Sequence, residues 1–152
     1  MRRRSFDFPV FDQPKFVDEP EMEEVPSNYK ELTILELMEK VTEMADESHL
    51  SDKFFKRVEP LTEILSELLG LTPVQCVLYS IFIENYDDNQ IRLSDIQQHT
   101  GARMIRLARY QSDIDAIEKK RYIRRAGCHG FGMDRKGSAY YVPHDSLKAL
   151  RE

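Results

Sequence analysis

The chain has 152 residues, 41% of them apolar and 32% charged, with a net charge of -5. This length and composition suit one domain with its own core. The longest apolar runs, such as residues 79–83, fall far short of the ~20 residues that a membrane helix needs. Residues 1–8 lack the apolar segment of a signal peptide. Cys76 and Cys128 are widely separated, so we expect a reducing, cytoplasmic setting.

The net charge conceals two regions of opposite sign. Residues 1–100 hold 10 Lys and Arg against 21 Asp and Glu, a net of -11. Residues 101–137 hold 10 Lys and Arg against four acids, a net of +6. A polyanion responds to the local electrostatic field, so the charge of residues 101–137 favours binding of nucleic acid. The alternative is an ordinary solvated helix face with a charged turn, which gives the same pattern of charge.

The first 31 residues contain prolines and acids with no helical or strand period. Residues 1–31 are therefore expected to form an extended or disordered arm. Its unusual feature is a series of aromatic residues among the prolines. Such a segment has the chemistry to dock as a peptide on another subunit or to fold back over its own domain. The simpler interpretation, which we favour, is a loose tail whose aromatic side chains cover part of the core. The aromatic residues are Phe6, Phe8, Phe11 and Phe16.

Residues 32–70 are predicted to form a helical extension. Thr33 with Glu36 has the spacing of a capping box at the start of an amphipathic helix. A second apolar periodicity begins after Ser51 and ends at Gly70. Because proline removes a backbone donor, Pro60 predicts a kink or break within it.

A buried helix is predicted to open the next region, residues 71–143. Thr72 and Gln75 repeat the capping box, and the helix that follows is apolar on most sides. Ser94 and Gln97 give the same spacing and predict a helix of under two turns that ends at Gly101.

Residues 102–120 place apolar side chains at helical spacing and polar ones off that stripe. The pattern predicts either one long helix or two helices joined near Gln111, because Ser112 and Asp113 resemble a second start. The apolar stripe consists of Leu107, Tyr110, Ile114 and Ile117. The polar residues beside it are Arg103, Arg106, Arg109, Gln111 and Ser112.

Two short runs of strand formers follow, at residues 121–125 and 139–142, around a glycine-rich basic loop. They predict a small β-hairpin whose cations are Arg124, Arg125, Arg135 and Lys136. Residues 144–152 are expected to begin a truncated helix or linker, starting at Asp145 and Ser146.

From residue 72 to residue 142 the chain resembles the winged helix-turn-helix domain of bacterial transcription regulators. In this resemblance residues 91–93 are a short strand, residues 94–101 the positioning helix and residues 114–125 the end of the recognition helix entering the wing. Arg121 stands where the family usually has glycine. The region is also similar to a variant winged helix that precedes the core of some bacterial AAA-type ATPases. The expected fold is mainly α with a small β-hairpin, a winged helix with two or three extra N-terminal helices.

The resemblance implies binding of double-stranded DNA, in a regulator or in an accessory domain of an ATPase that continues beyond Glu152. The apolar faces of the flanking helices suggest a homodimer. The alternative is a protein-interaction module that docks a partner or an attached ATPase core without DNA. The residues expected to meet DNA are Arg103, Arg106, Arg109, Gln111, Ser112, Arg124, Arg125, Arg135 and Lys136.

We expect no enzymatic activity and no cofactor in this region. The four histidines are far apart in sequence, and Cys128-His129 has no second pair at ligand spacing, so a metal site is not expected. Residues 130–132 are too short for a phosphate-binding loop.

Overall fold

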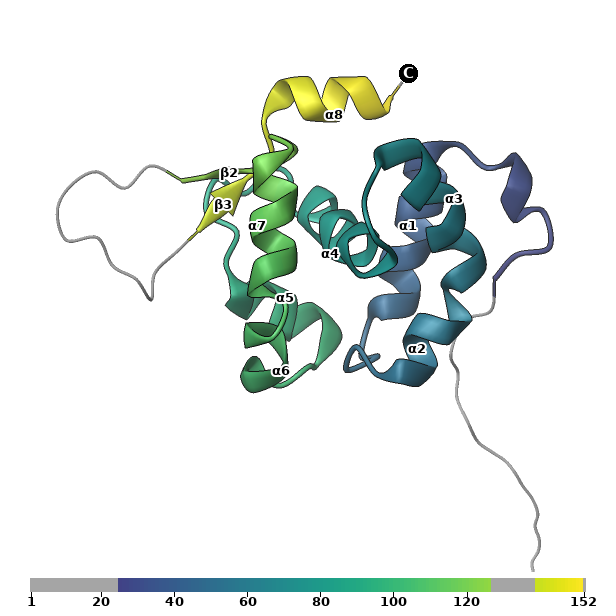
Figure 1. Cartoon of the computed structure of the whole chain (residues 1–152), viewed down its shortest axis with the longest axis horizontal. Coiled ribbons are helices and arrows are strands. Elements are labelled where there is room, and N and C mark those ends of the chain that lie inside the picture. Colours follow the sequence, from purple (N-terminus) through teal and green to yellow (C-terminus); the bar gives the residue numbers. More distant parts are fainter. Residues whose placement is uncertain (1–24, 127–138, 152) are drawn as a thin grey trace, which may run out of the picture.

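A computed structural model describes residues 25–126 and 139–151. These residues form a mainly helical fold with a two-stranded antiparallel hairpin, which confirms the expected mainly-α class with a small β-hairpin (Figure 1). The aromatic residues of the arm and the glycine-rich loop with Arg135 and Lys136 lie outside the described residues.

The first helices form where the capping signals predicted them. After a short 3-10 turn, η2 (Tyr29–Glu31), helix α1 (Ile34–Ala45) begins at the predicted capping box of Thr33 and Glu36. The Thr33 amide donates to Glu36 Oε1 at 2.9 Å, so the two residues satisfy free backbone donors of the first turn.

The predicted break at Pro60 is confirmed. Helix α2 (Asp52–Arg57) ends at Val58, and α3 (Glu59–Leu69) starts there with Pro60 in its first turn. Proline is compatible with that position because the amides of a first turn have no helical partner.

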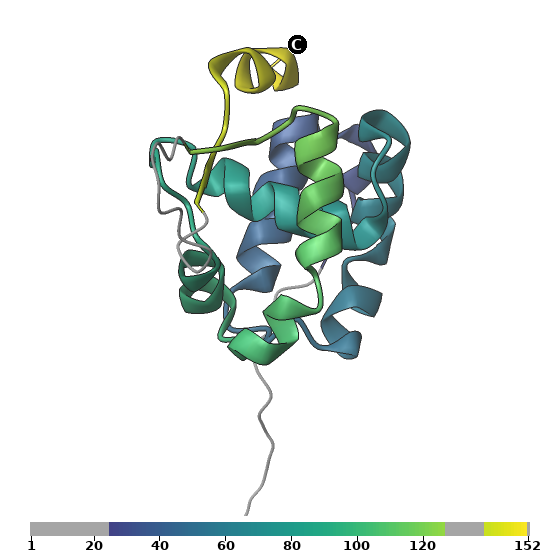
Figure 2. The same cartoon turned by 60° about the vertical axis from the view of Figure 1, so that its left-hand side comes forward.

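Helix α4 (Pro73–Glu84) is the central element of the fold. Every residue from Cys76 to Ile83 is buried, as the apolar sequence of this helix predicted. It packs against α1, α3 and α7, which surround it in Figures 1 and 2. One hydrophobic core joins residues from α1 to α8, and the apolar side of α1 and Phe54 are buried within it.

Helix α5 (Leu93–Thr100) begins earlier than predicted. Its cap is Arg92, whose amide donates to Asp95 Oδ2 at 2.8 Å, while Ser94 is an exposed residue of the first turn. The prediction of a start at Ser94 and of fewer than two turns was therefore wrong, because a carboxylate can satisfy the first turn as well as a serine. The predicted end at Gly101 is confirmed, with a φ of 75°.

Residues 102–120 form two helices, as one of the two interpretations predicted. Helix α6 (Met104–Ala108) is followed by α7 (Gln111–Lys119). Leu107, Ile114 and Ile117 are buried, so the stripe faces the core across the break.

The hairpin pairs β2 (Arg124–Arg125) with β3 (Tyr140–Tyr141) in antiparallel register. Ile91 forms an isolated bridge with Tyr140 and so adds a third extended segment beside them. Helix α8 (His144–Leu150) begins directly after Pro143, one residue before the predicted start at Asp145.

Among the described residues, no single helix is long and apolar enough to cross a membrane. Helices α3 and α4 meet that criterion only as a pair, and they are bent by 85° at their junction.

Candidate nucleic-acid interface

Three arginines surround the short helix α6. Arg103 is its cap, Arg106 lies within it and Arg109 follows its last residue. Arg103 and Arg109 are exposed, and Arg106 is half-buried. Together they line an open pocket of about 580 Å³, whose other lining residues are His49, Ser51 and Ile105.

The opposite wall of this pocket is the loop between α1 and α2. Arg106 Nη1 donates to the Leu50 carbonyl oxygen at 3.0 Å. This bond fixes one arm of the guanidinium and leaves the remaining N–H groups for a ligand. Arg106 is thus positioned by a residue far from it in sequence.

The loop itself is held against the end of α5. The His49 amide donates to the Thr100 carbonyl at 2.7 Å, and His49 Nδ1 lies 2.8 Å from the Gly101 carbonyl oxygen. Glu47, His49 and Leu50 have φ values of 58°, 60° and 51°, a conformation that non-glycine residues rarely adopt. These hydrogen bonds compensate for the strain and tie the first half of the chain to the cationic region.

Apolar side chains stand between the arginines. Ile105 is 76% exposed and Met104 is 40% exposed, whereas most large apolar residues of the described region are buried. The surface therefore offers guanidinium groups and apolar groups together, and both kinds of contact are available to a ligand.

Helix α2 adds two cations, Lys53 and Lys56, that were not predicted from the sequence to belong to this surface. The ring of Phe55 lies 6.4 Å from that of Tyr110, which places α2 beside the junction of α6 and α7. Lys53 and Lys56 are exposed on this helix, with Asp52 as its one acid. They fall in the net-acidic first hundred residues, so a count along the chain does not reveal them.

The hairpin end of α7 has a different environment. Arg124 is exposed, but Arg125 Nε lies 3.2 Å from Glu118 Oε1 and Arg125 Nη2 lies 3.5 Å from Asp115 Oδ1. The guanidinium also lies 5.3 Å from the centre of the Tyr140 ring. Burial lowers the pKa of Arg125, yet Tyr140 and the two carboxylates outweigh this and hold it above its ordinary value.

The polar residues expected beside the arginines have unlike roles. Gln111 Nε2 donates to Asp115 Oδ1 at 3.0 Å and to the Tyr140 hydroxyl at 3.1 Å, which ties α7 to the hairpin. Ser112 is exposed on α7, and Arg135 and Lys136 lie outside the described residues.

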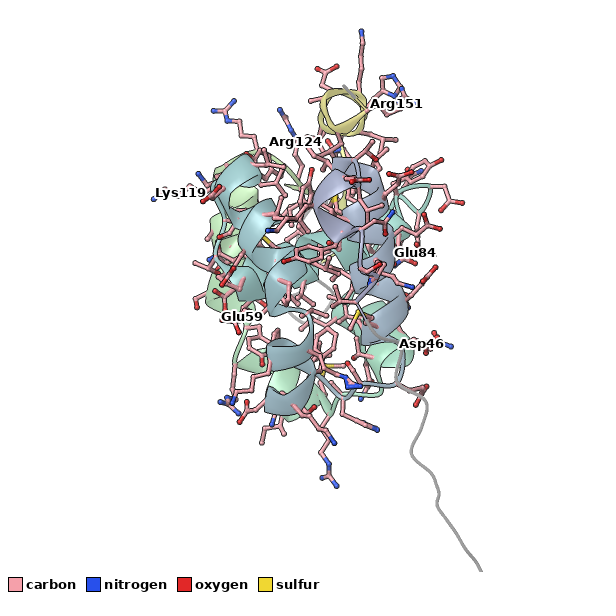
Figure 3. All side chains as sticks on the ribbon, turned by 90° about the vertical axis from the view of Figure 1, so that its right-hand side faces the viewer. Asp46, Glu59, Glu84, Lys119, Arg124 and Arg151 are labelled. Carbon is pink, nitrogen blue, oxygen red and sulfur yellow. The ribbon has the colours of Figure 1, made fainter. Side chains whose placement is uncertain are left out.

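The cations therefore form two groups, one at each end of α7. Helix α7 has nine residues, which makes it about 14 Å long. Figure 1 shows α6 at one end of it and the hairpin at the other. Lys119 is the last residue of α7 and Arg124 the first of β2, and Figure 3 shows both above the acids Glu84, Glu59 and Asp46. The positive charge that the sequence places in residues 101–137 is therefore not one continuous surface, because Arg125 is paired with Asp115 and Glu118 between the two groups.

No cluster of three or more His, Cys, Asp or Glu residues that suits a metal ion occurs in residues 25–126 and 139–151. Burial raises the pKa of the Cys76 thiol to about 12, so it stays protonated and unreactive at neutral pH. Cys128 and His129 lie outside the described residues.

No protein-family model, no curated protein and no solved structure matches the chain.

Proposed function

We propose that this protein is a nucleic-acid-binding module of the winged helix-turn-helix type, with α6 as its principal contact. The order of elements supports this: α4, the bridging residue Ile91, α5, the turn at Gly101, α6 with α7, and the hairpin. In such domains the helix after the turn enters the major groove, and the hairpin reaches the adjacent backbone.

The observation that carries the proposal is the state of Arg103, Arg106 and Arg109. No ion pair within the described part of the chain joins any of the three to a carboxylate. Their charge is therefore available to phosphates, while the Leu50 carbonyl keeps Arg106 in place. The ligand class proposed is double-stranded DNA, either for a regulator or for the accessory domain of an ATPase.

A second candidate is a protein-interaction module that binds without DNA. The exposure of Ile105 and Met104 favours it, because exposed apolar side chains next to arginines are typical of protein interfaces. The pairing of Arg125 with Asp115 and Glu118 favours it too, since it removes one cation from the DNA contact.

Salt dependence separates the two candidates. Fluorescence anisotropy with a labelled 20-base-pair duplex measures the dissociation constant at 50 and 200 mM salt. Three phosphate contacts give a logarithmic slope near -2.7, or about 40-fold weaker binding at the higher salt. If the duplex fails to bind at 50 mM salt, the proposed DNA binding is contradicted and the protein-interaction module remains as the candidate function.

A further inference from the structure

The α6 pocket has the chemistry to hold an acidic segment with large apolar side chains. Its arginines attract carboxylates, and Arg103 and Arg109 are exposed on its rim. Ile105, 76% exposed, offers an apolar contact in the same pocket. A purely apolar peptide would leave the charges unused, and a purely acidic one would leave Ile105 in water.

The chain itself contains a segment of this chemistry. Residues 5–24 hold seven acids against one lysine, and four phenylalanines stand among them. The prolines at positions 9, 14 and 20 favour an extended backbone, which reduces the entropy lost when a peptide binds. This arm is complementary to the pocket in both charge and apolar character.

The point of attachment permits the contact. Val25 is partly buried against the core, and the short turn η2 that follows packs on α3. An extended chain covers about 3.4 Å per residue, so the nine residue steps from Val25 to Phe16 cover about 30 Å. A domain of this size has a radius of gyration of about 14 Å, so half of its circumference measures about 60 Å. The 19 residue steps from Val25 to Phe6 span about 65 Å when extended, so the arm is long enough to reach the α6 pocket.

A second groove with apolar lining residues suits the arm less well. It lies between α1 and α4 and has a volume of about 340 Å³, with Ile83 and Tyr86 among its lining residues. Glu39 and Glu84 also line it, and their charge repels an acidic segment. Charge thus distinguishes the two surfaces.

We propose that residues 5–24 dock on the α6 pocket of their own chain and compete there with nucleic acid. The competition rests on the proposed function, whereas the docking does not. The arm supplies carboxylates in place of phosphates and covers Ile105 with phenylalanine rings. A duplex must then displace the arm before it reaches Arg103 and Arg109.

Paramagnetic relaxation in the full-length chain tests the docking without DNA. A spin label is attached to Gln13→Cys in a Cys128→Ser background, where Cys76 is too buried to react. We expect the Ile105 δ1 methyl signal to lose most of its intensity and that of Ile83 to keep it. The matched variant Arg103→Glu/Arg109→Glu should restore the Ile105 signal.

Other patterns of broadening overturn the docking. Loss of the Ile83 signal in place of Ile105 puts the arm in the groove between α1 and α4. Broadening that appears only when spin-labelled and isotope-labelled chains are mixed shows a contact between two copies. An unchanged Ile105 signal shows that the arm does not occupy the pocket.

Duplex binding tests the competition separately. Phe8→Ser/Phe11→Ser removes apolar contacts of the arm and keeps its charge, so the duplex should bind about threefold tighter or more. The salt series of the unmodified chain shows whether the duplex binds at all. Broadening at Ile105 with no duplex binding refutes the proposed function alone. An unchanged affinity of the Phe variant refutes the competition.

Discussion

The two ends of α7 carry charge of the same sign in different surroundings. At the α6 end, Arg103 and Arg109 are exposed and make no ion pair among the described residues. At the hairpin end, Arg125 lies between Asp115 and Glu118. A dense run of arginine in a sequence is therefore a poor measure of the field that a ligand meets. The carboxylates brought in by folding decide where the charge stays available.

Charge reversal at each end of α7 should give the largest difference in duplex affinity between the two ends. Arg103→Glu/Arg109→Glu removes two phosphate contacts and adds repulsion, so we expect duplex affinity at 50 mM salt to fall about 100-fold. Lys119→Glu/Arg124→Glu changes the same number of charges at the other end and should cost about threefold or less. Anisotropy titration measures both variants, and circular dichroism verifies that they fold.

The salt slope of these variants sharpens the comparison further. The α6 variant should lose about two units of slope, and the hairpin variant about half a unit or less. Equal losses at the two ends would mean that DNA lies along the whole of α7, contrary to the proposed contact.

The fold was predictable where local chemistry determines it. The capping residues Thr33 and Thr72 and the break at Pro60 act within a few residues, so the sequence shows them directly. The start of α5 was missed because two signals competed, and the Asp95 carboxylate bonded the Arg92 amide in preference to a cap at Ser94.

The site was less predictable than the fold, because its parts come from distant positions. The three arginines of α6 could be chosen from their place beside an apolar stripe. Nothing local shows that Leu50 accepts a hydrogen bond from Arg106, 56 residues away in sequence, or that His49 lines the same pocket. The pairing of Arg125 with Asp115 also depends on how the hairpin folds back over α7.

At the α6 end, adding a single methyl group at Gly101 should have a large effect on the stability of the fold. With φ at 75°, an added Cβ would lie 3.0 Å from His49 Cε1 and 3.2 Å from Glu47 Oε1. The left-handed conformation alone costs alanine about 1–2 kcal/mol. We expect Gly101→Ala to lower the free energy of unfolding by about 2 kcal/mol, measured by urea denaturation.

Gly70→Ala is the matched control for that substitution. Gly70 has a similar φ of 71°, but the nearest atom to an added Cβ is the flexible Lys120 Nζ at 3.5 Å. We expect a loss of about 1 kcal/mol, from the backbone alone. Equal losses for the two glycines would show that the His49 contact adds nothing at the α6 end.

At the hairpin end, Arg121 allows the reverse substitution, in which glycine replaces a larger residue at a positive φ. It follows Lys120, the C-cap of α7, with a φ of 69°, and its amide donates to the Glu118 carbonyl at 2.8 Å. The resemblance places glycine at this position, and the backbone indeed has the conformation that glycine favours. Arg121→Gly removes the strain of about 1–2 kcal/mol but gives the unfolded chain more freedom, so a net stabilisation of about 0.5 kcal/mol is expected.

Two controls separate backbone strain from charge at this position. Arg121→Ala removes the same charge and keeps the strain, so its stability should stay near that of the original chain. Lys120→Gly puts glycine at a φ of -80°, where its freedom only destabilises the fold by about 0.5–1 kcal/mol. If Arg121→Ala stabilises the protein as much as Arg121→Gly, the gain comes from relief of repulsion among Lys119, Lys120 and Arg121. The hairpin end would then carry mutually repelling cations that no carboxylate of the described residues neutralises. In that case both ends of α7 would offer positive charge to a ligand, and the difference between them would be smaller than proposed.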